Sequence, residues 1–292
     1  MYLPDIVLTP QVFATPDMEQ ALLGAEAVVM VTPSIGVRET AESMKPHLPS
    51  DTPVVILSKG VEGGSNMLMT EVLEDVLGNK KRVAGLSGPN HAEEVSKGIP
   101  SATVVAAYEP SVGELFQDIF MTPFFRVYTN PDVVGVELCG ASKNVVAIAV
   151  GMCDGLGYGD NTKATLMTRG LAEMTRLGVK LGANPMTYMG LAGMGDLIVT
   201  CMSRHSRNRG LGELIAKGGT MQEFYDKTHM VAEGAVACIT VDELGKREGL
   251  ELPITQQVRG ILYEGVDVAM GEKALLGRGA KDELHGLGLV TD

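Results

Sequence analysis

The chain has 292 residues, a mass of 30.9 kDa and a net charge of −12. Its 45% hydrophobic and 21% charged residues are typical of a globular protein and exclude disorder for most of the chain. Because 36 acidic residues oppose 24 basic ones, we do not expect the broad basic face that binding to nucleic acid or to an anionic membrane requires. The length predicts one or two domains.

The cysteines and the first residues predict a reduced, cytoplasmic protein. Cys139, Cys153, Cys201 and Cys238 show neither CxxC spacing nor a histidine pattern typical of zinc, so no metal site is expected. No Lys or Arg precedes Arg38, so the basic start of a secretory signal is missing. The longest uncharged apolar stretch, 144–153, is too short for a membrane span, and no membrane insertion is expected.

The first 130 residues alternate short β-branched runs with helix-like stretches. Strands are expected at 27–31, 54–58, 83–86, 103–106 and 125–128, and helices at 35–44, 65–77, 92–97 and 111–120. Nearly continuous apolar strands that alternate with helices favour a parallel sheet covered on both faces. We therefore predict an α/β domain of the Rossmann-like, doubly wound class over residues 1–133.

After residue 130 the strand-like runs disappear and apolar residues recur at helical spacing. Helices are expected at 134–153, 161–181, 211–217, 232–248 and 255–263, and glycine-rich joints at 155–159 and 190–195 separate some of them. The sequence therefore predicts an all-α C-terminal domain over residues 134–292.

Lys143 is the most unusual single residue. On a helix, its neighbours three and four positions away are Gly140, Cys139, Val146 and Ala147, which are all small or apolar. A lysine on such a face loses water, its pKa falls, and it becomes suited to act as a general acid or base. The alternative is a helix lysine that extends its ammonium group to water.

A basic cluster lies at 204–209. Arg204, His205, Arg207 and Arg209 occur within six residues of an otherwise acidic chain, with Ser206 and Asn208 between them. Arginine offers a planar fork that matches phosphate and carboxylate oxygens, so this segment could form an oxyanion pocket. A solvated basic loop is the alternative.

Two predicted strands end in residues that could meet a ligand. The segment GPNH, residues 88–91, follows one strand and opens a helix, and Lys59 follows another. Ligands of open α/β sheets bind beyond the carboxyl ends of the strands, although an ordinary turn explains either segment in isolation. No GxGxxG, Walker A, HExxH or GxSxG pattern occurs in the chain.

Taken together, these segments resemble the bacterial NAD(P)-dependent glycerol-3-phosphate dehydrogenases. The resemblance runs from the second residue almost to the C-terminus. The matching motifs are YLPD at residue 2, SKGVE at 58, LSGP at 86, ASKNV at 141, GLGYGDNTK at 155, RGLAEM at 169, GMGDL at 193, TC at 200, SRNR at 206, VAEG at 231 and LGR at 276.

The resemblance implies an oxidoreductase that interconverts sn-glycerol 3-phosphate and dihydroxyacetone phosphate with NAD or NADP, for phospholipid biosynthesis. It implies Lys143 as the proton donor and acceptor, oriented by Asp196 with Thr200. The implied substrate-binding residues are Lys59, Gly88, Asn90, Lys143, Asp196, Ser206, Arg207 and Asn208. The implied cofactor-binding residues are Lys59, Ala92, Arg207, Val231 and Glu233. A homodimer is expected by analogy.

The family places the YLPD motif well inside the chain, after a βαβ unit that carries a glycine-rich turn. Here the motif begins at Tyr2, so the expected dinucleotide-binding domain is truncated. Either translation starts upstream of Met1, or the chain is a real fragment. Without this unit the chain is expected to bind a dinucleotide poorly. The alternatives to the enzyme are a non-catalytic remnant that binds a phosphometabolite, or a related hydroxy-acid dehydrogenase.

Overall fold

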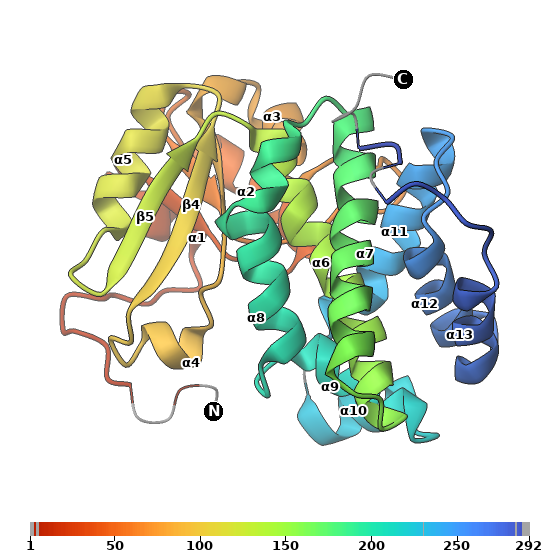
Figure 1. Ribbon diagram of the computed structural model, residues 1–292. Coiled ribbons are helices and arrows are strands. Elements are labelled where there is room, and N and C mark those ends of the chain that lie inside the picture. The colour runs from red at the N-terminus through yellow and green to blue at the C-terminus, as the bar shows by residue number, and fades with distance from the viewer. Residues whose placement is uncertain (1–2, 4–5, 230, 284, 288–292) are drawn as a thin grey trace.

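The structure, a computed structural model, describes residues 3, 6–229, 231–283 and 285–287. Tyr2, Pro4 and Asp5 of the YLPD motif lie outside the described residues. Figure 1 shows the molecule as two parts, an α/β part built from the first half of the chain and a helical part built from the second. This is the predicted combination of an α/β domain followed by an all-α domain.

The α/β part contains a five-stranded sheet in the order β1-β2-β3-β4-β5. Each strand overlaps one of the five predicted runs. The strands are β1 (Val28–Met30), β2 (Val54–Ile56), β3 (Val83–Ser87), β4 (Ser101–Ala107) and β5 (Phe125–Asn130). The helices of this part are α1 (Met18–Leu22), α2 (Val37–Met44), α3 (Met69–Leu77), α4 (Ala92–Val95) and α5 (Pro110–Phe120).

The sheet is parallel except at one pair of strands. β3 and β4 run antiparallel, whereas the other three pairs are parallel, so the prediction of a parallel sheet holds with this one exception. The connection from β3 to β4 contains only the four-residue helix α4. A parallel return needs a crossover, usually a longer helix such as α5, and strand composition does not reveal the direction of a strand.

Both faces of the sheet are covered, which explains the nearly continuous apolar strands. Val55, Leu86 and Val105 pack with Phe116 of α5 in one cluster. Their neighbours point to the opposite face, where Val54 and Ile56 join the cluster of α2 and α3. Side chains alternate between faces with a period of two, so each strand needs apolar residues at consecutive positions.

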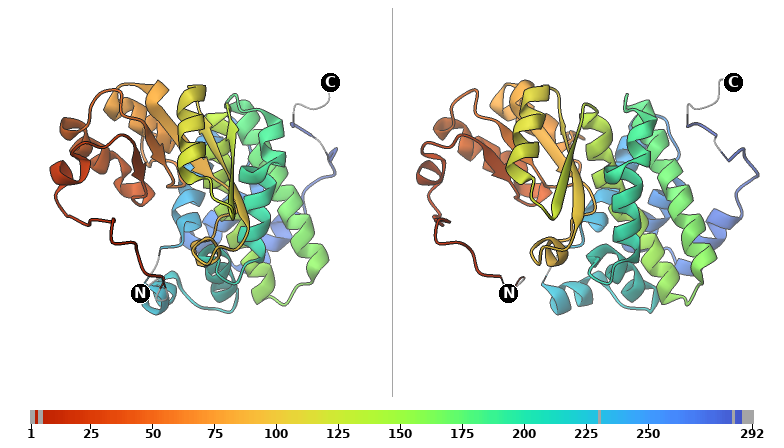
Figure 2. Two further views of the ribbon diagram at one scale, coloured as in Figure 1. Left: turned by 90° about the vertical axis from the view of Figure 1, so that its left-hand side faces the viewer. Right: turned by 60° about the vertical axis from the view of Figure 1, so that its left-hand side comes forward.

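The helical part surrounds one long buried helix, α6 (Val133–Gly155). α6 packs against α7, α8, α9, α11 and β3, so it joins the two parts of the molecule (Figures 1 and 2). α6 is long and apolar enough to span a membrane, but 94% of its most apolar window is buried inside the protein. A core helix of a folded protein accounts for that composition.

The other helices of this part are α7 (Asp160–Lys180), α8 (Asp196–Met202), α9 (Arg207–Ala216), α10 (Met221–Thr228), α11 (Glu233–Arg247), α12 (Pro253–Tyr263) and α13 (Val268–Leu276). The sequence did not predict α8, α10 and α13, which have at most nine residues and too few turns for a clear apolar period. α9 begins earlier than predicted because the Ser206 hydroxyl accepts a hydrogen bond from the Arg209 N–H and caps the helix.

Close packing of α9 on α6 depends on Gly212. A Cβ atom at this position would lie 2.0 Å from the backbone oxygen of Ile148 in α6. We expect Gly212→Ala to lower the free energy of unfolding by about 1–3 kcal/mol or more, because backbone must move apart. Chemical denaturation measures this, with Gly210→Ala as the matched control, since its Cβ would meet only the Phe224 ring at 3.6 Å. Equal stabilities of the two variants would contradict the prediction.

Candidate active site

Lys59, Gly88 and Asn90 lie at the carboxyl ends of β2 and β3, where the α/β part faces α6. Gly88 has a φ of +153°, and a Cβ there would lie 2.9 Å from the Thr103 Cα, so only glycine fits without strain. The Asn90 amide donates to the Thr103 hydroxyl at 3.3 Å. The turn after β3 is therefore held against the start of β4.

Three charged groups meet between the two parts of the molecule. The Lys143 Nζ of α6 donates to Asp196 Oδ1 at 2.7 Å and to the Thr200 hydroxyl at 2.6 Å. The Lys59 Nζ donates to Asp196 Oδ2 at 2.6 Å. Asp196 and Thr200 are one turn apart on α8, so one helix face presents both groups to Lys143. We call Lys59, Lys143 and Asp196 the lysine–aspartate cluster.

Burial shifts the pKa values of this cluster. The side chain of Lys143 is only 6% exposed, and burial together with the positive charge of Lys59 lowers its pKa from 10.5 to about 8. Burial alone would raise the pKa of Asp196, but the ammonium groups of Lys59 and Lys143 outweigh that effect and hold its pKa below the usual value. Asp196 is therefore ionised near neutral pH, and Lys143 can gain or lose a proton there.

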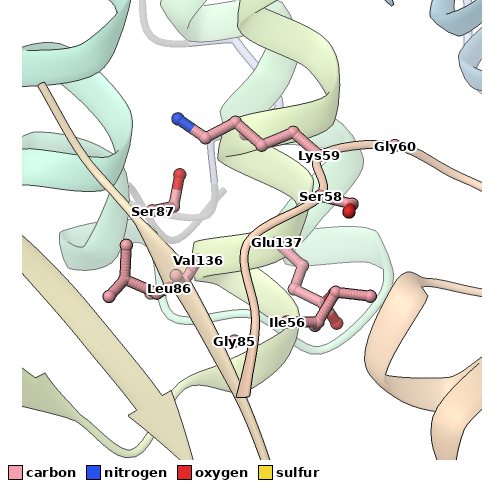
Figure 3. A pocket seen from close by; sticks show the side chains of 10 residues that line it. Ile56, Ser58, Lys59, Gly60, Gly85, Leu86, Ser87, Val136 and Glu137 are labelled. Atoms are coloured by element: carbon pink, nitrogen blue, oxygen red, sulfur yellow. The ribbon is translucent and has the colours of Figure 1, made fainter. Parts of the chain in front are cut away.

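Gly140 lets Lys59 lie across α6. A Cβ at position 140 would approach the Lys59 Cγ to 3.3 Å and the Ser87 hydroxyl oxygen to 3.1 Å. Figure 3 shows Lys59 extending over α6. Beneath it lies a small cavity of about 10 Å³, which the ends of β2 and β3 and Glu137 of α6 line. Ser87 points toward Lys59 from the end of β3.

The start of α9 carries the second group of predicted residues. Ser206 and Asn208 are buried, whereas Arg207 is exposed. The Asn208 amide donates to the Asn144 Oδ1 at 3.0 Å, and its own oxygen accepts from the Gly234 N–H at 2.8 Å. Asn208 thus joins α6, beside Lys143, to the first turn of α11.

The basic cluster at 204–209 does not act as one unit. Arg209 pairs with Asp154 at 2.6 Å and so fastens α9 to the end of α6. Arg204, His205 and Arg207 are exposed. Arg209 is therefore occupied within the fold, and an oxyanion site at this end of α9 would depend on the exposed residues rather than on the whole cluster.

Glu233 begins α11 and faces the α/β part. Its carboxylate accepts a hydrogen bond from the Ser34 hydroxyl, after β1, at 3.1 Å. Burial raises the pKa of Glu233 above its usual value. A cleft of about 470 Å³ lies beside this contact, lined by Ser34, Ile35, Arg38, Glu39, Glu42, Val61, Glu62, Gly63, Val236 and Thr240.

The structure brings Lys59, Lys143 and Asp196 into direct contact, and links Asn208 to Gly234 next to Glu233. Ala92 and Val231 are exposed, and their roles stay predictions. Sequence reasoning missed two contacts, those of Ser34 and Asn144. Ser34 follows a strand at the carboxyl end of the sheet, which is a signal that could have found it.

A cluster of this kind, between an α/β sheet and a helical part, is suited to proton transfer on a ligand held beyond the strand ends. Comparison of the sequence with known protein families identifies the class of protein. The model of the NAD-dependent glycerol-3-phosphate dehydrogenase N-terminus matches residues 1–112, and that of the C-terminus of the same family matches residues 132–271. The chain therefore belongs to the NAD-dependent glycerol-3-phosphate dehydrogenase family.

Individual relatives agree with this assignment. Glycerol-3-phosphate dehydrogenase [NAD(P)+] of Moorella thermoacetica is 48% identical over 97% of this chain and 84% of its own length. The protein of the same name from Pelotomaculum thermopropionicum is 46% identical over 99% of this chain and 84% of its own. The crystal structure of glycerol-3-phosphate dehydrogenase from Coxiella burnetii matches with a TM-score of 0.91 and 36% identity, over 95% of this chain and 85% of that one.

Proposed function

We propose that this protein interconverts sn-glycerol 3-phosphate and dihydroxyacetone phosphate with NAD or NADP, and so supplies glycerol 3-phosphate for phospholipid synthesis. The observation that carries the proposal is the buried Lys143, which shares Asp196 with Lys59 between the two parts of the molecule. The high identity to proteins named for this activity supports it. The proposed domain boundary is residue 133, and the proposed form is a cytoplasmic homodimer.

Lys143 is the proposed acid and base. In the reduction it donates a proton to the carbonyl oxygen of dihydroxyacetone phosphate, and in the oxidation it takes that proton back. Asp196 and Thr200 hold the Lys143 Nζ with two hydrogen bonds, which leaves the third proton of the ammonium group for the substrate. Lys59, Gly88 and Asn90 line the substrate from the strand ends, and Ser206, Arg207 and Asn208 hold its phosphate.

The residues around Glu233 fit the nicotinamide half of a dinucleotide. A cleft of about 470 Å³ lies within the usual size of a ligand site and adjoins Ser34 and Glu233 beyond the strand ends. Of the proposed cofactor-binding residues, Glu233 meets this cleft through Ser34, and Lys59, Ala92, Arg207 and Val231 would hold the cofactor outside the cleft lining. When bound, NAD(P)H supplies the hydride, and the protein contributes position and charge. The described residues contain no GxGxxG turn for the pyrophosphate.

A direct assay tests the activity. Purified protein is mixed with dihydroxyacetone phosphate and NADH or NADPH, and the loss of nicotinamide absorbance is followed. Because weak dinucleotide binding is expected, the cofactor is supplied at high concentration, and we expect turnover that depends on the phosphorylated substrate, and the reverse reaction with glycerol 3-phosphate. A protein that binds glycerol 3-phosphate in calorimetry but shows no turnover with either cofactor would contradict the proposal and favour a binding role.

Arg207 is expected to bind the substrate phosphate. Arg207→Ala should raise the KM for dihydroxyacetone phosphate about tenfold or more, because a hydrogen bond to a charged group is lost. The rate with non-phosphorylated dihydroxyacetone, measured at high concentration, should change much less. Arg204→Ala is the matched control, since Arg204 is also exposed but precedes the Ser206 cap. Equal losses for both substrates would argue against a phosphate contact.

A further inference from the structure

We propose that Glu137 is a positioning residue that holds Lys59 against α6, where Lys59 can face Asp196. The proposal rests on the function proposed above, and it adds a residue that does not itself touch the substrate. Glu137 lies on α6 six residues before Lys143 and is buried within an otherwise apolar turn of the helix.

The carboxylate of Glu137 binds the first turn of α3. Its Oε1 accepts a hydrogen bond from the Thr70 N–H at 3.0 Å, and its Oε2 accepts one from the Thr70 hydroxyl. Gly85 of β3 leaves room for it, since a Cβ there would lie 3.3 Å from the Glu137 Cγ. Glu137 thus connects the helix of Lys143 to the α/β part by accepting from an N–H group in the first turn of α3, where backbone N–H groups have no partner within the helix.

This carboxyl group is held at an energetic cost. Glu137 is 8% exposed, and the described part of the chain shows no ion pair to it. Burial raises its pKa from 4.5 to about 7, although the hydrogen bonds from Thr70 act in the opposite direction. An apolar side chain would avoid the burial of a carboxyl group but would leave the buried Thr70 N–H and hydroxyl without these acceptors, so Glu137 serves the contact with α3 and not packing alone.

The contact with α3 also fixes the segment that carries Lys59. Val61 pairs with Leu68 in an isolated β-bridge, and the Glu62 N–H donates to the Met67 oxygen at 2.8 Å. The loop after β2 therefore returns upon itself just before α3. Because the bridge joins both ends of this loop, an anchor at Thr70 restrains Lys59 as well.

α6 supports this segment at two points one turn apart. Thr70 binds Glu137, and the methylene groups of Lys59 lie against Gly140. Figure 3 shows Glu137 and Lys59 on the two sides of the small cavity between α6 and the strand ends. From Gly140 the helix continues three residues to Lys143. The hydrogen bonds between Glu137 and Thr70 therefore restrain the distance between Lys59 and Lys143.

Lys59 needs such a restraint because water competes for its ammonium group. Its side chain is 20% exposed, whereas that of Lys143 is 6% exposed. A lysine released from Asp196 could extend into solvent and regain its hydration. Lys143 would then lose the positive neighbour that lowers its pKa.

Glu137→Gln tests the role of the carboxylate with little change in shape. The amide keeps one oxygen that can accept from the Thr70 N–H, but an NH2 group replaces the second carboxylate oxygen and the negative charge is lost, so the contact with Thr70 weakens. The readout is the pKa of Lys143 in the free protein, measured from the pH dependence of lysine acylation at that residue by mass spectrometry. We expect that pKa to rise from about 8 toward 10.5 by about one unit, as Lys59 moves away. Glu114→Gln, an exposed change on α5, is the control.

Kinetics provide the second readout. With dihydroxyacetone phosphate and NADH, Glu137→Gln should lower kcat about tenfold and move the alkaline fall of the rate to higher pH. Thr70→Val, which removes only the hydroxyl donor, should show a weaker effect of the same kind, and Thr70→Ser should restore wild-type behaviour. The Thr70 variants also keep the proposal testable if Glu137→Gln does not fold.

The outcomes separate the two proposals. If the wild type turns over its substrate but Lys143 acylates with the same pKa in Glu137→Gln and in the wild type, the positioning role is overturned. A shifted Lys143 pKa supports it even if the wild type shows no turnover, and that second result contradicts the proposed function alone. A loss of thermal stability with an unchanged pKa marks a structural role and also overturns the proposal.

Discussion

Lys143→Ala is expected to lower kcat by about 10²- to 10⁴-fold while the KM for dihydroxyacetone phosphate changes little. The reason is that the variant lacks the proposed proton donor, whereas the proposed phosphate contacts at the start of α9 remain. Asp196 stays paired with Lys59 at 2.6 Å, so the site does not collapse through an unpaired charge. Steady-state kinetics on the purified variant, with circular dichroism to check folding, measures the effect.

The pH profile gives this prediction a sharper form. Because the pKa of Lys143 is about 8, the wild-type rate of reduction should fall above that pH, and the rate of oxidation should rise up to it. Both limbs should be absent in Lys143→Ala. A small primary amine should restore part of the activity by entering the space that the lysine side chain leaves. Turnover like that of the wild type would exclude the acid–base role.

Lys143 illustrates what the sequence alone could predict. Its small and apolar helix neighbours indicated a lysine kept from water, and the structure confirms it as buried, against the alternative of an ammonium group in solvent. The partner of Lys143 could not be found in this way. Asp196 lies 53 residues further along the chain. A local pattern carries no information on such a contact, so Asp196 came only from the family resemblance.

Other features were beyond local pattern for related reasons. The antiparallel β3–β4 pair was missed because an apolar strand looks the same in either direction. Glu137 was passed over because it is one acidic residue in a run that reads as a buried helix, and only the position of α3 explains it. The apolar strands and the long helices were predicted correctly, because their burial repeats along many residues.

Asp196→Asn should destabilise the protein. It should also move the fall of the reduction rate and the rise of the oxidation rate to lower pH. Asn has nearly the same shape, but it has one acceptor oxygen, whereas the carboxylate of Asp196 offers one oxygen to each of the two lysines. Removing one member of a buried ion pair lowers the free energy of unfolding by about 3–5 kcal/mol. The loss is smaller here because Lys143 can release its proton and become neutral. Without the carboxylate, which raises the pKa of Lys143, burial lowers that pKa further, by about one unit or more.

The sign of the pH effect on stability follows from Asp196 itself. Its pKa in the folded protein lies below the usual 3.8, so it stabilises the fold above that value and the contribution is lost as the pH falls through the folded pKa. Asp196→Asn should therefore lower the free energy of unfolding at pH 7, and this difference should shrink in acid. In kinetics, the fall of reduction and the rise of oxidation should shift together, because the equilibrium constant ties the two directions. If both rate changes stay near pH 8 in a folded Asp196→Asn variant, Asp196 does not set the pKa of Lys143.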